Sequence, residues 1–229
     1  MKKRYSEYVN YKYSSNDGWF NPRVEWDTEL FIDPLLIKNS DIPEFTEAYN
    51  KIINYFSSVL TVLGNNNISK NLKKQMVNFP EVREVNLGYS YNSNVGKGLT
   101  GEDSIKVLKN LKMFLDLGLF KIEDFEAITI FDNNISVDKM SDMIINILKE
   151  EFINYSVRIA RENNFETKKF NQRLGYNFDE RRWVFKSVEM PYIINDNSEE
   201  IPVILTPKSF LVTCLNRNDS SFIDWLYSK

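Results

Sequence analysis

The sequence predicts an α+β fold that is predominantly helical, with a small mixed or antiparallel sheet built largely from C-terminal strands. Apolar residues recur at steps of three and four through the middle of the chain, and the longest such pattern covers residues 135–164. Shorter apolar runs without that period follow towards the C-terminus. With 229 residues, of which 42% are hydrophobic, the chain can bury one substantial core, so residues 1–229 are expected to form a single domain.

Three regions follow one another in this domain. Residues 1–40 are rich in Tyr, Asn and Ser and keep no sustained period, which predicts an irregular or extended N-terminal region. Within it, Pro34 disfavours the helical conformation for Asp33, so Asp33 is interpreted as a turn-stabilising residue, with a site carboxylate as the alternative. Residues 41–164 are expected to form the helical core, and residues 165–229 combine a basic segment with a β-α end.

Start and stop signals divide the helical core. Apolar residues keep a helical spacing over residues 44–63, and Gly64 ends that helix. Ser69 can cap a short basic helix, KNLKKQMVNF, which Pro80 ends. The next stretch, EVREVNLGYS, alternates imperfectly and predicts a strand that carries Glu84.

A glycine-rich stretch, GYSYNSNVGKGLTGEDS, follows that strand. It contains Gly96, Gly98 and Gly101 in G-x-G-x-x-G spacing, with Lys97 between the first two and a helix expected from about Glu102. Backbone N–H groups of such a loop can approach a phosphate, and a helix N-terminus favours an anion. The alternatives are a flexible loop and a turn that needs positive φ at glycine. A dinucleotide fold is disfavoured because no buried parallel strand precedes the loop, and no Walker A motif is present.

The helix expected over residues 135–164 has two distinct faces. Its core face is formed by apolar residues at helical spacing: Val137, Met140, Ile144, Ile147, Leu148, Tyr155 and Ile159. Beside that face, four residues step by four and form an acidic and amide stripe: Asp138, Asp142, Asn146 and Glu150. The stripe is either a solvated flank of the helix or a site.

A local excess of positive charge marks residues 158–186. Aromatic residues alternate there with the cations, a mixture that can grip phosphates and stack bases. The candidate nucleic-acid-binding residues are Arg158, Arg161, Arg181, Arg182, Trp183 and Lys186. A solvated basic segment beside core aromatics is the equally weighted alternative.

The end of the chain is expected to be β followed by α. RRWVFKSVEM predicts a strand, residues 201–205 a second short strand, and SSFIDWLYSK a closing helix. The stretch EMPYIINDNSEEIP, with its polar NDNSEE tip, predicts an exposed hairpin or a mobile loop.

The composition excludes several kinds of chemistry. Histidine is absent, which removes Ser-His-Asp and Cys-His catalysis and ordinary zinc sites, so any metal would be a hard cation such as magnesium held by carboxylates. The single cysteine, Cys214, has apolar neighbours and is interpreted as a small buried hydrophobe. No long apolar run and no secretory signal are recognised, so a cytoplasmic protein without membrane contact is expected. A net charge of −3 gives no global signature of nucleic-acid binding.

Five stretches carry a resemblance. FIDPLLI, LGYSYNSNVGKGLTG, ISVDKMSDMIINIL with INYSVRI behind it, and PVILTPKSFL are similar to an uncharacterised family of bacterial proteins associated with phage-defence gene clusters. The similarity runs from about Phe20 to Leu211. It implies a setting in bacterial immunity and brings no catalytic role to any residue.

Two functions are compatible with these observations. The first is a non-catalytic subunit or sensor of a defence system that binds another protein subunit and, in a second role, DNA or RNA, without a cofactor. The alternative is a magnesium-dependent nuclease with Glu84, Asp138, Asp142 and Lys208 as catalytic residues, of which Asp138 and Asp142 would hold the metal. No complete D-x(n)-E-x-K arrangement is found on a strand pair, and this favours the subunit.

Overall fold

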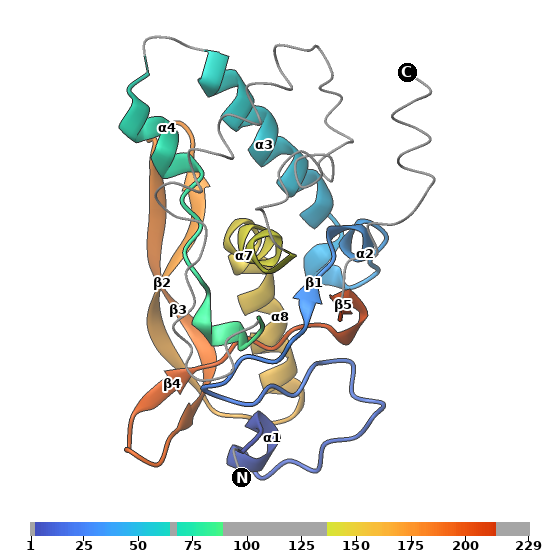
Figure 1. Cartoon of the computed structure of the whole chain (residues 1–229). Coiled ribbons are helices and arrows are strands. Elements are labelled where there is room, and N and C mark those ends of the chain that lie inside the picture. The colour runs from blue at the N-terminus through green and yellow to red at the C-terminus, as the bar shows by residue number, and fades with distance from the viewer. Residues whose placement is uncertain (1–2, 65–67, 89–136, 214–229) are drawn as a thin grey trace.

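A computed structural model describes residues 3–64, 68–88 and 137–213 of the chain and shows a mixed α+β fold. Three helices lie at its centre: α3 (Ala48–Gly64), α7 (Val137–Ile147) and α8 (Lys149–Glu162). A long antiparallel hairpin of β2 (Thr167–Asn177) and β3 (Arg182–Ile194) lies along one side and packs against α8 (Figure 1).

Short elements complete the described part of the chain. They are α1 (Tyr5–Tyr8), β1 (Phe31–Ile32), α2 (Pro34–Lys38), the 3-10 helix η1 (Pro43–Phe45), α4 (Lys70–Met76), the 3-10 helix η2 (Arg83–Val85), β4 (Glu200–Pro202), the 3-10 helix η4 (Lys208–Phe210) and β5 (Leu211–Val212). Strand β4 extends the hairpin into an antiparallel sheet of order β2-β3-β4, and β1 pairs with β5 in a second antiparallel sheet. The coarse expectation of a mixed α+β fold is therefore met. The expected sheet from C-terminal strands fits only loosely, because β2 is not among the predicted strands and β5 pairs with β1 of the N-terminal region.

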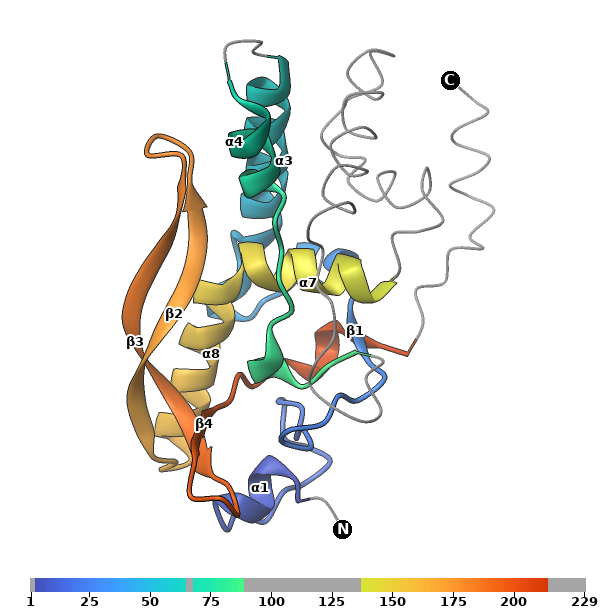
Figure 2. The same cartoon turned by 60° about the vertical axis from the view of Figure 1, so that its left-hand side comes forward.

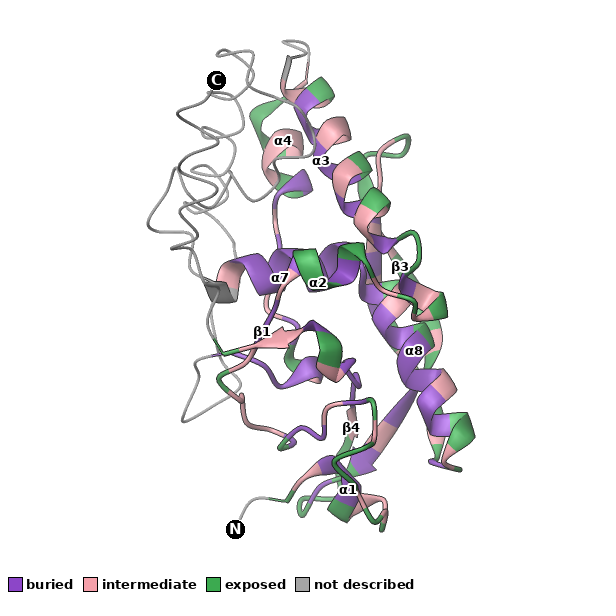
Figure 3. Cartoon of the chain, turned by 90° about the vertical axis from the view of Figure 1, so that its right-hand side faces the viewer, coloured by how far each residue is buried: buried purple, intermediate pink, exposed green. Residues whose placement is uncertain are grey.

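Helix α7 is the element around which the other segments pack. Every residue from 140 to 149 is buried, including both faces of the helix (Figure 3). A helix that is surrounded on all sides must be held by several neighbours, and α7 contacts β1, β2, α3 and α8. Ile32 in β1 donates its backbone N–H to the Ser141 hydroxyl at 3.1 Å, which ties the N-terminal region directly to this helix.

The prediction of a single helix over residues 135–164 is wrong in one respect, because the described part of this range forms two helices, α7 and α8. The regular helix stops at Ile147, Leu148 takes φ −103° and ψ 20°, and α8 then starts in a new direction (Figure 2). Leu148 is fully buried, and the break lets both helices keep apolar contacts that one straight helix would lose. The expected strand over residues 81–90 is also different in the described part, where η2 forms a 3-10 turn.

Local capping signals are confirmed. The Ser69 hydroxyl accepts a hydrogen bond from the Leu72 backbone N–H at the start of α4. Asp33 caps α2 in the same way, with its carboxylate 2.9 Å from the Leu35 nitrogen, so it stabilises a turn, as the favoured interpretation states. Pro34 occupies the first helical position, where its missing N–H costs nothing.

Candidate functional site

Four polar side chains meet where α7 breaks into α8. We call Glu84, Asn146, Lys149 and Arg173 the polar junction; they come from η2, α7, α8 and β2 respectively. The break at Leu148 places Asn146 and Lys149 on either side of it, towards the turn of residues 80–84 and the hairpin. Three segments distant in sequence are therefore joined through polar contacts inside the core.

Lys149 and Glu84 form a buried ion pair in the polar junction. The Lys149 Nζ lies 3.2 Å from Glu84 Oε1, and the two side chains are only 8% and 19% exposed. Burial lowers the pKa of Lys149, and the neighbouring Glu84 carboxylate opposes that shift. The charge of Glu84 is thus compensated within the chain.

Arg173 brings a second cation to the polar junction. Its Nη2 donates to the Asn146 Oδ1 at 2.5 Å and to the Asn78 carbonyl at 3.0 Å, and its guanidinium carbon lies 3.8 Å from the centre of the Trp183 ring. Burial lowers the pKa of Arg173 to about 10. Among the residues that the structure describes, the partners of the Arg173 guanidinium are therefore neutral oxygens and an aromatic face, not a carboxylate.

The acidic and amide stripe is divided by the helix break. Asn146 is buried, and its Nδ2 donates to the Pro80 and Asp142 carbonyls at 2.7 and 2.8 Å. Asp142 is 9% exposed, whereas Glu150 is exposed and lies 3.8 Å from Lys186. Asp138 belongs to α7, but its side chain lies outside the described part. The stripe is buried at Asp142 and Asn146 and solvated at Glu150.

The remaining predicted residues of a metal site or phosphate site lie elsewhere. Lys208 donates to the Ser15 carbonyl at 3.0 Å and sits 4.7 Å from the centre of the Tyr13 ring, so its contacts are with the N-terminal region. The proposed phosphate loop, Gly96, Lys97, Gly98 and Gly101, lies outside the described residues. Within the described ranges, no group of three or more acidic, cysteine or histidine side chains could hold a metal ion.

The predicted nucleic-acid-binding residues are spread over α8 and the hairpin, and several are paired with glutamates. Arg158 contacts Glu44 at 2.7 Å and Glu162 at 2.9 Å. The other pairs are Arg161 with Glu189, Arg182 with Glu180, and Lys186 with Glu150. Arg181 is exposed in the turn between the strands, where its φ is 54°.

Trp183 is not available for stacking on a base in this conformation. It is 9% exposed, and its Nε1 donates to the Gln75 carbonyl at 2.9 Å. Its ring packs against Tyr55, Phe79 and Tyr176. The aromatic residues of this segment are thus largely core, as the alternative interpretation states, while Phe185 is 69% exposed.

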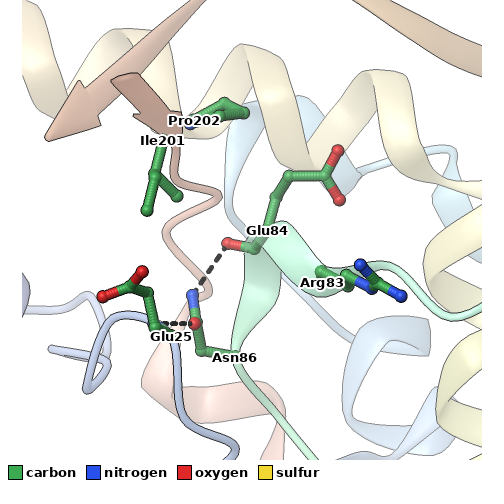
Figure 4. A pocket seen from close by; sticks show the side chains of 6 residues that line it. All are labelled: Glu25, Arg83, Glu84, Asn86, Ile201 and Pro202. Carbon is green, nitrogen blue, oxygen red and sulfur yellow. Dashed lines mark hydrogen bonds between the residues drawn. The ribbon is translucent and has the colours of Figure 1, made fainter. Parts of the chain in front are cut away.

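A pocket of about 440 Å³ opens beside η2. It is lined by Glu25, Arg83, Glu84, Asn86, Ile201 and Pro202 (Figure 4). The sequence interpretation missed every lining residue except Glu84, and no local signal marks Glu25. Asn86 stands one residue from Leu87-Gly88, where a turn signal could have drawn attention to it.

Comparisons with known proteins add a family and no activity. A family model described as a domain of unknown function, DUF8370, matches residues 9–216. No curated protein and no solved structure matches the chain. Among the helices that the structure describes, none is both long and apolar enough to span a membrane.

Proposed function

The chain belongs to the DUF8370 family, and from that premise we propose that it is a non-catalytic subunit or sensor whose β2–β3 hairpin binds a protein partner. The proposed setting is the bacterial cytoplasm and an anti-phage defence system, and it rests on the motif resemblance described above. The observation that carries the proposal is the surface of the hairpin. The edge strand β2 has no second neighbour among the described strands, and the adjacent strand β3 presents the exposed aromatic residue Phe185.

The alternation of hydrogen-bonded and non-hydrogen-bonded pairs in the hairpin shows which backbone N–H and C=O groups of β2 point away from β3. Thr167 lies opposite Pro191, which has no N–H, so this pair exchanges no hydrogen bonds. The Pro191 carbonyl instead accepts from the Val203 N–H, at 2.9 Å, on the other side of β3. Pairs alternate along an antiparallel ladder, so Lys169 and Asn171 also direct their backbone groups away from β3. A partner strand could pair with them.

Phe185 supplies an apolar anchor on the same hairpin. It lies opposite Arg173 in the register and is 69% exposed. A large aromatic side chain with so much exposed area is typical of an interface residue. The partner surface that covers this ring is therefore expected to be apolar.

The test uses Phe185 against a matched exposed residue on the same strand. Complex formation with proteins encoded by neighbouring genes would be measured with purified components for the wild type, Phe185→Ser and Ile194→Ser. Ile194 is 56% exposed but lies at the β4 end of β3. We expect Phe185→Ser to weaken the complex about tenfold or more, a typical loss for an aromatic anchor, and Ile194→Ser to leave it unchanged. An unchanged complex in Phe185→Ser would remove this face of the hairpin from the interface.

Nucleic acid is the second proposed ligand of this segment. Contacts through about four cations would give a slope near −3 to −4 in a plot of log K against log salt concentration. The variant Arg181→Ala/Arg182→Ala should weaken binding to every DNA or RNA sequence alike. Unchanged binding by this variant would assign residues 158–186 to protein contacts alone.

A magnesium-dependent nuclease remains the second candidate because Glu84 reaches α8 one turn from the Asp142–Asn146 stretch. Incubation of the purified chain with DNA or RNA and magnesium or manganese tests it directly. We expect no cleavage, because Lys149 already compensates the Glu84 charge that a hard cation would need. Cleavage that is abolished in Asp138→Asn and Asp142→Asn would replace the subunit proposal by the enzyme.

A further inference from the structure

The pocket beside η2 is formed by three segments that are distant in sequence. Glu25 comes from the N-terminal region, Glu84 and Asn86 from the turn of η2, and Ile201 and Pro202 from β4. Hydrogen bonds join these segments: Glu25 N–H donates to the Asn86 Oδ1 at 2.9 Å, and Ile204 N–H donates to the Glu84 carbonyl at 2.8 Å. The walls of the pocket are therefore fixed by the fold.

Glu25 brings an uncompensated negative charge to the pocket. Its Oε1 lies 3.0 Å from the Asn195 Nδ2, and the same nitrogen donates to Glu199 Oε2 at 2.9 Å. Asn195 is 6% exposed and neutral, so it holds two carboxylates together without cancelling their charge. Over the described ranges, Glu25 has no lysine or arginine partner. Adding a cation would therefore lower the electrostatic energy at this point.

The other lining side chains leave space beside that carboxylate. The Arg83 and Glu84 side chains point away from Glu25, and Ile201 extends into the space between Glu25 and Glu84 (Figure 4). Arg83 is directed instead towards Glu81, with Nε 4.0 Å from Oε2. Pro202 adds a second apolar surface. The pocket thus has one anionic group and an apolar wall.

The backbone holds the two polar groups of the pocket in place. Glu25 and Asn86 have φ of 66° and 54°, in the left-handed region, and the hydrogen bond between them links these two turns. Asn tolerates this region, whereas Glu adopts it at some cost. The Glu25 carboxylate itself is held by the Asn195 amide, and a carboxylate held before binding loses little conformational entropy when a ligand arrives.

We propose that this pocket binds the cationic end of a lysine or arginine side chain from a protein partner. Such a side chain has a long alkyl stem, which packs on Ile201 and Pro202, and a charged head, which reaches Glu25. A bare divalent cation fits less well, because calcium and magnesium take six or more oxygen ligands and Glu25 is the one lining carboxylate that faces the pocket. This site lies apart from the exposed Phe185 of the hairpin and does not depend on the proposed function.

The experiment is a titration of the wild-type protein followed by NMR. The probes are capped tripeptides Ala-X-Ala in which X is arginine, lysine, norleucine or glutamate. We expect the arginine and lysine peptides to shift the Asn86 side-chain amide and the Ile201 methyl signals, and to bind about tenfold more tightly than the norleucine peptide. This measurement requires no variant, so a folding defect cannot confuse it. Equal binding of the norleucine peptide would overturn the proposal.

Two matched variants then test which carboxylate binds the cationic peptide. Glu25→Gln keeps the length of the side chain and its backbone bond to Asn86, and it should reduce the affinity for the arginine peptide about tenfold. Glu199→Gln is the control, because Glu199 shares the Asn195 nitrogen but does not line the pocket. A larger loss in Glu199→Gln, or signal shifts at Asn86 with calcium but not with the peptides, would refute the assignment.

Discussion

Glu84 and Glu25 both line the pocket beside η2, yet their charges are treated in opposite ways. Glu84 turns away from the pocket to Lys149, a side chain that is only 8% exposed, and the pair closes a contact inside the polar junction. Glu25 is held by the neutral Asn195 and faces the open pocket. The Glu84 charge is therefore neutralised by an ion pair within the chain, whereas the Glu25 charge can still pair with a cation from outside the chain.

A carboxylate in the sequence therefore does not by itself mark a binding site. A carboxylate that is buried with a cation serves the structure, since removing either member leaves the other uncompensated. A carboxylate with a neutral partner and solvent on one side can still gain a cation. Substitutions at paired and unpaired charges test this distinction.

The largest effect is expected for the same substitution at the two glutamates. Glu84→Gln leaves the Lys149 ammonium buried without a counter-ion, so the free energy of unfolding should fall by about 3 kcal/mol. Glu25→Gln should change it by about 0.5 kcal/mol or less, because the new amide oxygen can still accept the hydrogen bond from Asn195 and no cation loses its counter-ion. Urea unfolding at pH 7, followed by circular dichroism, measures both. Equal losses in the two variants would abolish the distinction.

The second effect concerns Arg173, the cation of the polar junction that has neutral partners. Arg173→Met keeps much of the stem but leaves the Asn146 Oδ1 and the Asn78 carbonyl without their donor, and we expect a loss of about 2 kcal/mol. Arg181→Met on the exposed turn is the matched control and should be neutral. The midpoint of thermal unfolding should therefore fall only in Arg173→Met, and an unchanged midpoint would count against a structural role for this cation.

The third effect appears at acid pH. Burial tends to raise the pKa of Glu44, but hydrogen bonds from Arg158 and the backbone prevail, so the pKa lies below its ordinary value of 4.5. The stabilisation is complete above that value and is lost as the pH falls through the lowered pKa. Glu44→Gln should reduce the stability at pH 7 by about 1 kcal/mol and flatten its decline below pH 4.5. A decline as steep as in the wild type would mean that other carboxyl groups dominate.

The smallest effect is expected for ion pairs in solvent. Arg161 is 71% exposed in its contact with Glu189, and Arg182 is 69% exposed beside Glu180. Replacing either arginine by Ala should change the free energy of unfolding by less than about 0.5 kcal/mol. Chemical unfolding at low and at high salt provides the measurement. A loss of unfolding free energy as large as that of Glu84→Gln would show that solvent exposure does not determine how much an ion pair stabilises this protein.

Local signals in the sequence predicted the local structure well. Ser69 caps α4 and Gly64 is the last residue of α3, both as predicted. Asp33 stabilises a turn as predicted, but this turn starts helix α2, which is not among the predicted helices. The polar tip NDNSEE lies in the hairpin between β3 and β4, where Asn195 accepts backbone N–H bonds from residues 197 and 199. Each of these features depends on residues only a few positions apart, so a short segment of sequence is enough to predict it.

Features that depend on distant residues could not be read in this way. No glycine or proline marks Leu148, because the break between α7 and α8 is a response to burial on all sides of the joint. Glu25 carries no local signal because Asn195, its partner, stands 170 residues away. Trp183 lies among cations in the sequence, but contacts with Tyr55 and Phe79 place it in the core.

The central position of α7 has a consequence for the order of folding during synthesis. This helix bonds to Ile32, 109 residues before Ser141, while Ser156 in α8 bonds to Leu205, 49 residues after it. The core therefore cannot close until about residue 205 has left the ribosome. Until then the apolar faces of α7 are exposed on the nascent chain, and contacts of such sequence separation form slowly. We expect truncated chains that end before β4 to bind chaperones and to be degraded.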